Sequence, residues 1–328
     1  MTSDDERYMW RAVDLARRAE LQAVCPNPRV GAVLVWQDRI IGEGYHQRCG
    51  EGHAEVNCLE SVAPEDESKI PDSTLYVTLE PCSHQGRTPS CARMLISRGI
   101  RRVVVGCLDP NPLVSGRGIS LLRQSGIEVS AGCLEEQCRQ VARVFLTNQE
   151  QGRPYIILKW AESADHFLDR LRQSPEERPV AFSTPHTRML VHRLRSCCSG
   201  IVVGRRTLEL DRPSLTNRYW PLSPYSPKRF LLSSQEVDLG PGWELLRSVS
   251  PESMSYLLME NVTSLLVEGG AETLRAFLEA DLWDEIYVEQ VPDVTLGEGV
   301  KAPSPGALTP DRELVRDGHH LCRYRRWA

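Results

Sequence analysis

The chain has 328 residues and a formal net charge of -5 at pH 7, so it is long enough for two domains and too acidic for a protein whose main partner is a nucleic-acid backbone. Its eleven cysteines are an odd number, and its first residues are acidic rather than a basic leader, so we expect a reducing cytoplasm and no secreted disulfide framework. No apolar run approaches the roughly 20 residues that span a bilayer, which argues against a membrane protein.

The first half of the chain alternates helices and strands. A capping box at residues 3–6 opens a helix, and residues 30–36 and 39–45 form two strands of a hairpin. The pattern continues with a helix that begins at His53, a strand at 73–79, a helix at 91–99, a strand at 102–106, a helix at 119–124, a strand at 127–130 and a helix at 134–148. This alternation predicts a largely parallel sheet that is covered on both faces and binds ligands at the carboxyl ends of its strands.

Three metal-binding side chains and one glutamate fall at the boundaries of these elements. Cys82 follows the strand at 73–79, while His53 and Cys91 each open a helix. One imidazole and two thiolates give zinc three protein ligands, and the fourth position is left for a water molecule. Glu55 follows His53 by two residues, as does the proton-shuttling glutamate of zinc nucleobase deaminases. The pattern therefore predicts a catalytic zinc site and a deaminase.

Other interpretations of this pattern stay open. A His-x-Glu at a helix start is often part of an ordinary surface helix, and a structural zinc site uses four Cys or His ligands at tight spacing. His84 lies between the two cysteines and is the candidate for a fourth ligand that would close the site. Two rival functions remain. One is a zinc domain that serves assembly, and the other is a deaminase that acts on RNA or DNA. The negative net charge of the chain argues against the second.

A second α/β pattern follows the polar stretch 148–153, which we take as the boundary between domains 1–147 and 148–328. A strand begins at Tyr155, and Thr184 with Pro185 opens a helix that turns Met189, Leu190 and Leu194 inward. The remaining elements are strands at 200–204, 229–232 and 264–267 and helices at 254–259 and 273–279, with long irregular stretches at 212–227 and 292–310.

The last strand of this pattern runs into Gly269 and Gly270 and then a helix, an arrangement that lets a phosphate approach backbone N–H groups. The same turn is also common as simple turn geometry, and no G-x-G-x-x-G fingerprint supports an ordinary Rossmann site. Several arginines are candidates to hold phosphates or are simply solvated: Arg188, Arg193, Arg195, Arg205, Arg206 and Arg218. From its residues alone, this half is predicted to bind an anionic ligand.

Several motifs resemble the bifunctional deaminase/reductase of bacterial riboflavin biosynthesis. They are Pro26-Asn27-Pro28-Arg29-Val30-Gly31, Gly44-Tyr45-His46, His53-Ala54-Glu55, residues 76–83 with His84, Gly86-Arg87-Thr88-Pro89, Cys91 and Asp109-Pro110-Asn111-Pro112. The resemblance implies a cytidine-deaminase-like α/β/α sandwich followed by a dihydrofolate-reductase-like α/β domain. It implies zinc-dependent deamination of 2,5-diamino-6-(5-phosphoribosylamino)pyrimidin-4-one, then NADPH reduction of the ribosylamino group to ribitylamino. The expected partner is then a small phosphorylated pyrimidine substrate, and neither nucleic acid nor a membrane is expected as a partner. The chain could also form a homo-oligomer.

The same resemblance implies the site residues. It makes His53, Cys82 and Cys91 the zinc ligands and Glu55 the proton shuttle. It places substrate at Asn27, Arg195, Leu215, Arg218 and Glu268. It places NADPH at Ala161, Ala181, Thr207, Asp211, Ser234, Gly270, Ala271, Glu272, Thr273, Leu274, Arg275 and Ala276.

The reductase half departs from the family pattern at three positions. His166 replaces a glycine, Ser233 replaces an aspartate, and Ala181 replaces an aromatic residue expected near the nicotinamide. A histidine in place of that glycine puts a side chain where close backbone approach is expected. The alternative function is therefore a deaminase whose second domain is a degenerate reductase that serves binding or assembly.

Overall fold

The computed structural model describes residues 2–83, 90–111 and 115–326. The chain divides into two compact units, Met1–Gln151 and Gly152–Ala328. The sequence suggests the polar stretch 148–153 as the boundary. The start of this stretch is helical, because the last helix of the first unit, α6, runs over Glu135–Gln151.

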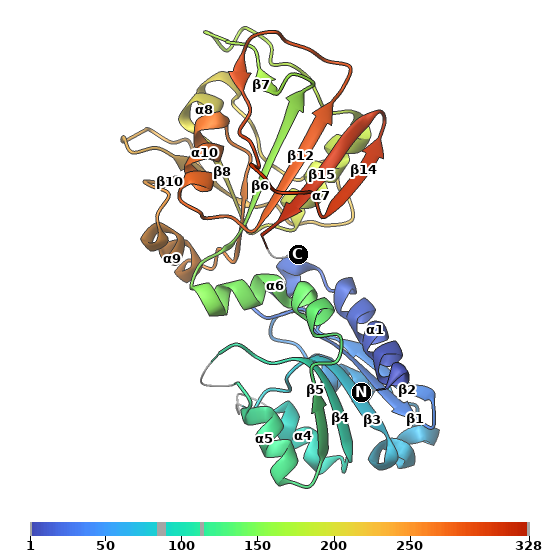
Figure 1. Cartoon of the computed structure of the whole chain (residues 1–328). Helices are drawn as coiled ribbons and strands as arrows, with labels where there is room; N and C mark the ends of the chain where they lie inside the picture. Colours follow the sequence, from blue (N-terminus) through green and yellow to red (C-terminus); the bar gives the residue numbers. More distant parts are fainter. Residues whose placement is uncertain (1, 84–89, 112–114, 327–328) are drawn as a thin grey trace. The chain divides into compact units, whose positions relative to one another are not determined.

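The first unit contains a five-stranded sheet in the order β2-β1-β3-β4-β5 (Figure 1). Its strands are β1 (Gly31–Trp36), β2 (Arg39–Tyr45), β3 (Thr74–Leu79), β4 (Arg102–Cys107) and β5 (Glu128–Ala131). The predicted hairpin of β1 and β2 is confirmed, but the prediction of a largely parallel sheet was wrong for the pair β1–β3, which is also antiparallel. Gln37 and Asp38 have φ values of 45° and 61°, the conformation of a two-residue hairpin turn, and this turn fixes the first antiparallel pair.

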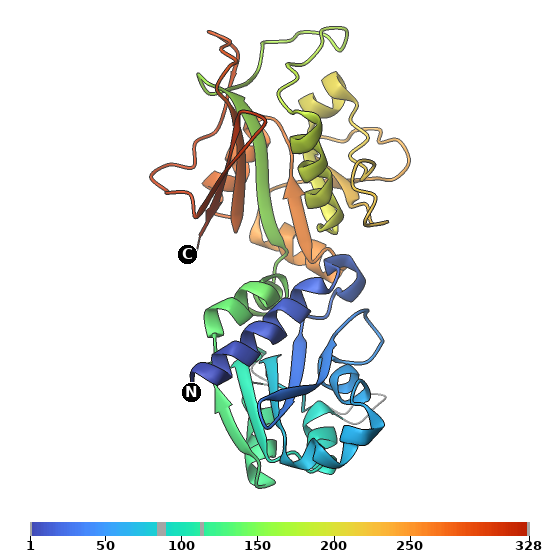
Figure 2. The ribbon, with the colours of Figure 1, turned by 90° about the vertical axis from the view of Figure 1, so that its right-hand side faces the viewer.

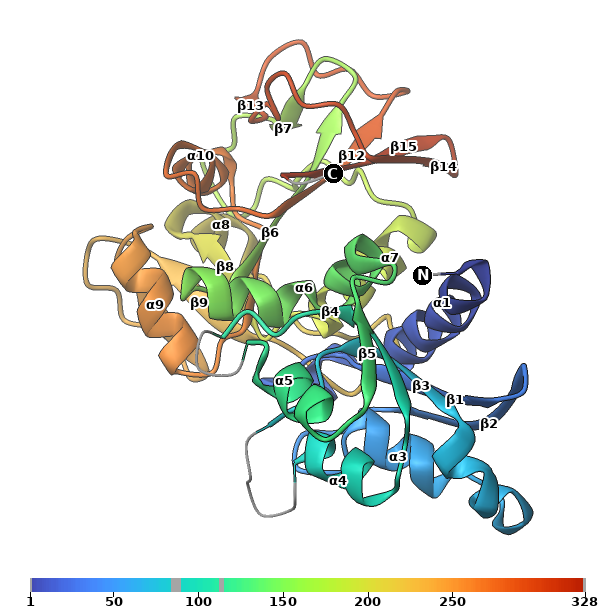
Figure 3. The same cartoon turned by 60° about the horizontal axis from the view of Figure 1, so that its bottom comes forward.

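Helices cover both faces of this sheet (Figure 3). One face carries α1 (Ser3–Arg18) and α6, and the other carries α3 (Ala54–Glu60), α4 (Cys91–Ser97) and α5 (Arg117–Gln124). The short α2 (Leu21–Val24) and the 3-10 helix η1 (Pro64–Asp72) complete the unit. A Cβ atom on Gly31 would lie 2.1 Å from the carbonyl oxygen of Ala12, so glycine lets α1 approach the sheet closely.

The capping box of α1 begins one residue earlier than predicted. Thr2, not Ser3, is the N-cap: its hydroxyl accepts the Asp5 N–H, and the Asp5 carboxylate accepts the Thr2 N–H. Asp5 also pairs with Arg102 at 2.9 Å. The ion pair with Arg102 holds the Asp5 side chain in place, and Asp5 is the acidic residue of the capping box.

The second unit is built on an eight-stranded sheet in the order β10-β9-β8-β11-β6-β12-β15-β14. The strands are β6 (Tyr155–Ser163), β8 (Gly200–Gly204), β9 (Lys228–Leu232), β10 (Trp243–Leu246), β11 (Ser264–Val267), β12 (Glu285–Val291), β14 (Arg312–Arg316) and β15 (His319–Arg325). Neighbours are parallel from β10 through β12, and only the pairs made by β15 are antiparallel. A separate small sheet joins β7 (Phe167–Asp169) to β13 (Val300–Lys301).

Four helices connect these strands, and α7 runs alongside the sheet (Figure 2). They are α7 (Pro185–Ser196), α8 (Arg205–Asp211), α9 (Pro251–Met259) and α10 (Ala271–Glu279). Thr184 caps α7 and Pro185 is its first residue, as predicted. The apolar residues expected to point inward are only half-buried, whereas Thr187, His192 and Ser196 are buried. The His192 ring faces the segment 212–227 and accepts the backbone N–H of Arg218 at 3.0 Å.

Among the described residues, no helix combines the length and the apolar character that crossing a membrane requires.

Candidate metal centre and ligand cavity

Three predicted metal ligands converge at one end of the first sheet. His53 is the N-cap of α3, Cys91 is the first residue of α4, and Cys82 follows β3. The His53 Nδ1 atom lies 3.7 Å from Cys82 Sγ and 3.4 Å from Cys91 Sγ. A tetrahedral zinc ion with bonds of about 2.0–2.1 Å to nitrogen and about 2.3 Å to sulfur separates such atoms by about 3.6 Å. The three side chains therefore fit zinc, with Nδ1 as the imidazole ligand.

The backbone around the site favours negative charge on sulfur. The Cys91 N–H donates to Cys82 Sγ at 3.3 Å, at the amino end of α4, where Ser90 is the N-cap. A hydrogen bond from the Cys91 thiol, with a further contribution from His53, lowers the pKa of Cys82 to about 4. Thiolate is the form that binds metal. The ligand set is therefore prepared for a cation by the fold itself.

Glu55 stands beside these ligands on the first turn of α3. Its side chain is buried, and this burial, with the charge of Cys82, raises the pKa of Glu55 to about 7. A carboxyl group with a pKa close to neutrality can both accept and donate a proton. The site thus combines a three-ligand cation site with a buried acid-base group.

Asn27 and His46 form a second, polar part of this site. The Asn27 Nδ2 atom is 3.2 Å from His46 Nε2, and His46 Nδ1 is 3.1 Å from the Gly52 carbonyl oxygen. A carbonyl only accepts, so His46 carries its proton on Nδ1 and accepts the Asn27 amide N–H at Nε2. The His46 ring also meets the His53 ring edge-on, with centroids 5.6 Å apart. His46 thereby links the Asn27 amide to the ring of a candidate metal ligand.

Glu80 was not singled out by sequence reasoning, although it precedes the Pro81-Cys82 pair. Its buried carboxylate accepts four backbone N–H groups. Oε2 accepts from Asp109 at 3.4 Å and Gly116 at 2.9 Å, and Oε1 accepts from Gly118 at 3.0 Å and Ile119 at 3.2 Å. A Cβ atom on Gly118 would lie 2.0 Å from the Pro81 carbonyl oxygen. Glu80 therefore joins the segment that carries Cys82 to the start of α5.

We expect Glu80→Gln to lower both the stability of the first unit and the deaminase activity that the sequence predicts for it, because an amide NH₂ would face a backbone donor. Each lost hydrogen bond to a charged group costs about 1.5–3 kcal/mol. Thermal unfolding and deaminase kcat/KM measure the two effects, and Glu128→Gln, an exposed glutamate on β5, is the control. Equal melting temperatures and activities for the two variants would contradict this role.

His84, the candidate fourth ligand, and the Gly86–Pro89 part of the family motif lie outside the residues that the structure describes.

The second unit contains a cavity of about 1150 Å³. It opens where β8, β9 and β11 end, with Gly204, Ser233 and Gly269 in its wall. Most predicted cofactor residues line it: Ala161, Thr207, Asp211, Ser234, Gly270, Ala271, Glu272, Thr273, Arg275 and Ala276. Ala181 is exposed and Leu274 is buried in the core, and neither is a lining residue. The Gly269–Gly270 turn therefore faces a cavity rather than acting only as a connection.

The predicted substrate residues divide into two groups. Glu268 lines the cavity, and Arg195 holds it with hydrogen bonds of 2.9 and 2.6 Å. Burial opposes ionisation of Glu268, but Arg195 outweighs it and lowers the pKa of this carboxyl group. Leu215 is buried and Arg218 is exposed; both lie on the segment 212–227 and neither lines the cavity. The cavity thus has an ionised carboxylate in its wall.

Two of the three departures from the family pattern, His166 and Ser233, lie in or near the wall of the cavity. His166 has a φ of 63°, in the left-handed region that glycine adopts most easily, which accounts for the family glycine. Its ring turns toward Glu162, with 2.8 Å between Nδ1 and Oε1, and does not line the cavity. Ser233 does line the cavity, and its hydroxyl accepts the Gln235 N–H at 3.2 Å. The histidine therefore leaves the cavity open.

Comparison with known proteins finds relatives for both units of the chain. Residues 2–107 match the family model of the cytidine and deoxycytidylate deaminase zinc-binding region, and residues 154–317 match that of the RibD C-terminal domain. The riboflavin biosynthesis protein RibD of Aquifex aeolicus is 36% identical over 94% of this chain and 93% of the relative. The chain belongs to the RibD family.

Other members agree with this assignment. RibD of Escherichia coli is 36% identical over 88% of both chains. A crystal structure from Thermotoga maritima, described as a diaminohydroxyphosphoribosylaminopyrimidine deaminase/5-amino-6-(5-phosphoribosylamino)uracil reductase, is 32% identical, covers 98% of both chains and has a TM-score of 0.85. The predicted family and the predicted two-domain α/β fold class are thereby confirmed, and both RibD halves are present in this chain.

Proposed function

We propose that this chain catalyses two consecutive steps of riboflavin biosynthesis. The first is hydrolytic deamination of 2,5-diamino-6-(5-phosphoribosylamino)pyrimidin-4-one in the unit Met1–Gln151, and the second is NADPH reduction of the ribosylamino group in Gly152–Ala328. The observation that carries the first step is the juxtaposition of His53, Cys82 and Cys91 with the buried Glu55. The cavity at the ends of the parallel strands supports the second.

Deamination exchanges an amino group for the oxygen of water. Zinc bound by His53, Cys82 and Cys91 would supply an acidified water molecule. Glu55 would take one proton from this water and pass it to a ring nitrogen, and would then pass the proton of the added hydroxyl group to the amino group, which leaves as ammonia while the ring carbon keeps the oxygen. Asn27, held by its hydrogen bond with His46, presents a polar edge to the pyrimidine ring.

NADPH fits the cavity of the second unit. Its volume of about 1150 Å³ lies just above the range of about 300–1,000 Å³ for pockets that hold small ligands, and a dinucleotide is larger than most such ligands. Cationic residues outnumber acidic ones in the wall: Lys159, Arg170, Arg172, Arg205, Arg206, Arg247, Arg275 and Lys301 against Asp169, Asp211, Glu268, Glu272 and Glu279. The cofactor supplies the hydride that reduces C1′ of the sugar in its opened carbonyl or imine form. Thr207, Ser234 and Gly270 would hold it, and Glu268 would orient the substrate.

A coupled assay with the purified full chain tests both steps. With the diamino-pyrimidinone nucleotide alone, we expect ammonia release without further change, and added NADPH should then be oxidised in equal amount to the ribityl product. Ammonia release without any NADPH oxidation on the deaminated intermediate would favour the alternative function, a deaminase with a degenerate reductase domain. Absence of both reactions would overturn the proposal.

We infer further that the substrate is the free nucleotide in the cytoplasm and not nucleic acid, because the net charge is negative and nucleic-acid binding needs a basic face. Turnover of an RNA oligonucleotide but not of the free nucleotide would contradict this inference. Homo-oligomerisation stays a prediction, which molecular mass in solution tests.

A further inference from the structure

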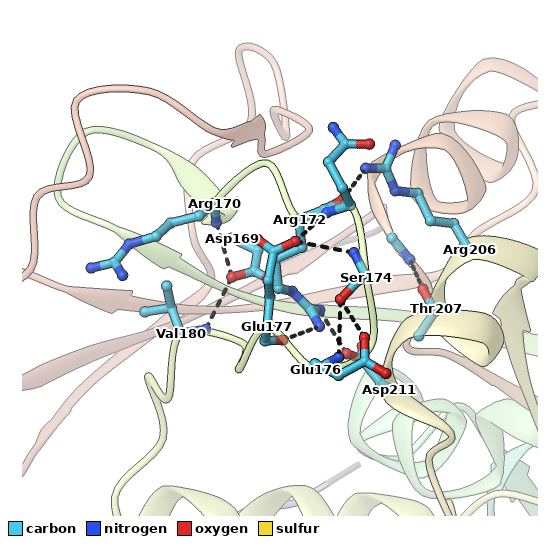
Figure 4. Close-up of polar contacts among 12 residues, drawn as sticks. Asp169, Arg170, Arg172, Ser174, Glu176, Glu177, Val180, Arg206, Thr207 and Asp211 are labelled. Carbon is cyan, nitrogen blue, oxygen red and sulfur yellow. Dashed lines mark hydrogen bonds and ion pairs between the residues drawn. The ribbon is translucent and has the colours of Figure 1, made fainter.

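The loop between β7 and α7 is folded around one buried arginine. Arg172 has a side chain that is only 6% exposed, and its Nε donates to Asp169 Oδ2 at 2.6 Å. Its Nη1 donates to the Glu177 carbonyl oxygen at 3.2 Å. Asp169 also accepts the Val180 N–H at 3.0 Å, which joins the two ends of the loop (Figure 4). Residues 169–180, called here the Arg172 loop, therefore form a closed structure with a guanidinium at its centre.

The same guanidinium reaches the cavity wall. Its Nη2 donates to Asp211 Oδ1 at 2.6 Å, at the last residue of α8. In return, Arg206 donates to the Arg172 carbonyl oxygen at 2.8 Å, and Thr207 accepts the Gly270 N–H at 3.1 Å. Figure 4 shows the contacts of Arg172 with its neighbours, and the hydrogen bond of Thr207 as a separate pair beside them. The Arg172 loop, α8 and the start of α10 are thus connected, and residues of all three line the cavity.

The charge of Arg172 matters because two carboxylates line a cavity that would hold phosphates. Asp169 and Asp211 are both lining residues, and each would repel an anion if it were left without a counter-charge. One guanidinium binds both because its N–H groups form a planar fork. A lysine ammonium has no such fork, so it would not hold both carboxylates in the same geometry.

We propose that Arg172 is a positioning residue for NADPH: it neutralises Asp169 and Asp211 and fixes the Arg172 loop and α8 as a preformed wall of the cofactor cavity. This inference rests on the proposed reductase function. It assigns Arg172 an effect on cofactor affinity and not on hydride transfer itself, because the side chain acts through Asp169 and Asp211.

The test measures the NADPH dissociation constant of the full chain by titration calorimetry, together with KM for NADPH and kcat of the reductase step. The variants are Arg172→Met, Arg172→Lys and the control Arg178→Met, which removes the same charge from an exposed position on the same loop. We expect Arg172→Met to weaken NADPH binding about tenfold or more, in line with the loss of charge-assisted hydrogen bonds. Arg172→Lys should give a smaller loss, Arg178→Met almost none, and kcat at saturating NADPH should change little.

The outcomes separate the inference from the function on which it rests. A wild-type chain that does not bind NADPH overturns the proposed reductase function and this inference with it. Wild-type binding with unchanged affinity in both Arg172 variants overturns the inference alone. If Arg172→Met does not fold, the NADPH affinity of folded Arg172→Lys protein decides. A weaker affinity than that of the wild type supports the inference, and an equal affinity overturns it. A fall in melting temperature or kcat with unchanged KM indicates a merely structural role and also overturns it.

Discussion

Replacing Glu55 with glutamine is expected to lower the deaminase kcat by roughly 10³-fold or more, because an acid-base group contributes about 10²–10⁴-fold and here serves several proton transfers. Glutamine has nearly the same shape as glutamate, but its amide group neither accepts nor returns a proton near neutral pH. The side chain is buried on the first turn of α3 and is not needed as a metal ligand. Zinc content and melting temperature should therefore stay close to those of the wild type.

Ammonia release at saturating substrate measures this effect, with metal analysis on the same samples. Glu60→Gln, an exposed glutamate at the end of the same helix, is the matched control and should retain full activity. Residual activity within tenfold of the wild type would show that another group moves the proton. Loss of zinc from Glu55→Gln would instead give Glu55 a structural role.

Replacing Glu268 with glutamine is expected to destabilise the second unit and to abolish its reductase activity. The Glu268 and Arg195 side chains are 10% and 13% exposed, so the substitution leaves a largely buried guanidinium without its counter-charge. Breaking such a pair by removing one partner costs about 3–5 kcal/mol of unfolding free energy. The substitution also removes the ionised carboxylate from the cavity that would hold substrate and cofactor.

Denaturant unfolding of the second unit measures the loss of stability, and NADPH oxidation with the deaminated intermediate measures the loss of activity. Glu236→Gln is the control, because Glu236 pairs with Arg247 in the same unit but is 83% exposed, and exposed pairs contribute little. Equal stability of the two variants would contradict the assigned strength of the Glu268–Arg195 pair. Deaminase activity should be unaffected in both.

The sequence was sufficient for features that depend on local pattern. His53, Cys82 and Cys91 each sit at the boundary of a helix or strand, and the carboxyl end of a strand in an α/β sheet faces the helix starts. Their convergence was therefore predictable without coordinates. The cap of α7 at Thr184 followed from the same kind of local signal.

Features that depend on partners far along the chain were not predictable. The four N–H groups that Glu80 accepts lie 29–39 residues away, and no periodicity marks them. Arg172 meets Asp211 across 39 residues, so its role appears only in the folded unit. The antiparallel pairing of β1 with β3 was missed for a related reason, because alternation of helices and strands does not determine strand direction when a hairpin opens the sheet.

The residues of the reductase half show a different limit. Most of the cofactor residues that the family resemblance supplied line the cavity, but the resemblance did not show that His166 would turn toward Glu162 and leave the cavity open. That outcome depends on a backbone conformation with positive φ and on a buried carboxylate that accepts the ring N–H.

Zinc K-edge absorption spectroscopy of the purified full chain tests the proposed metal centre most directly. We expect zinc with two sulfur neighbours at about 2.3 Å, a single imidazole and one light atom from water. A second imidazole signal would mean that a histidine closes the fourth position. In that case Glu55 would have no water to deprotonate, and the proposed deamination would be contradicted.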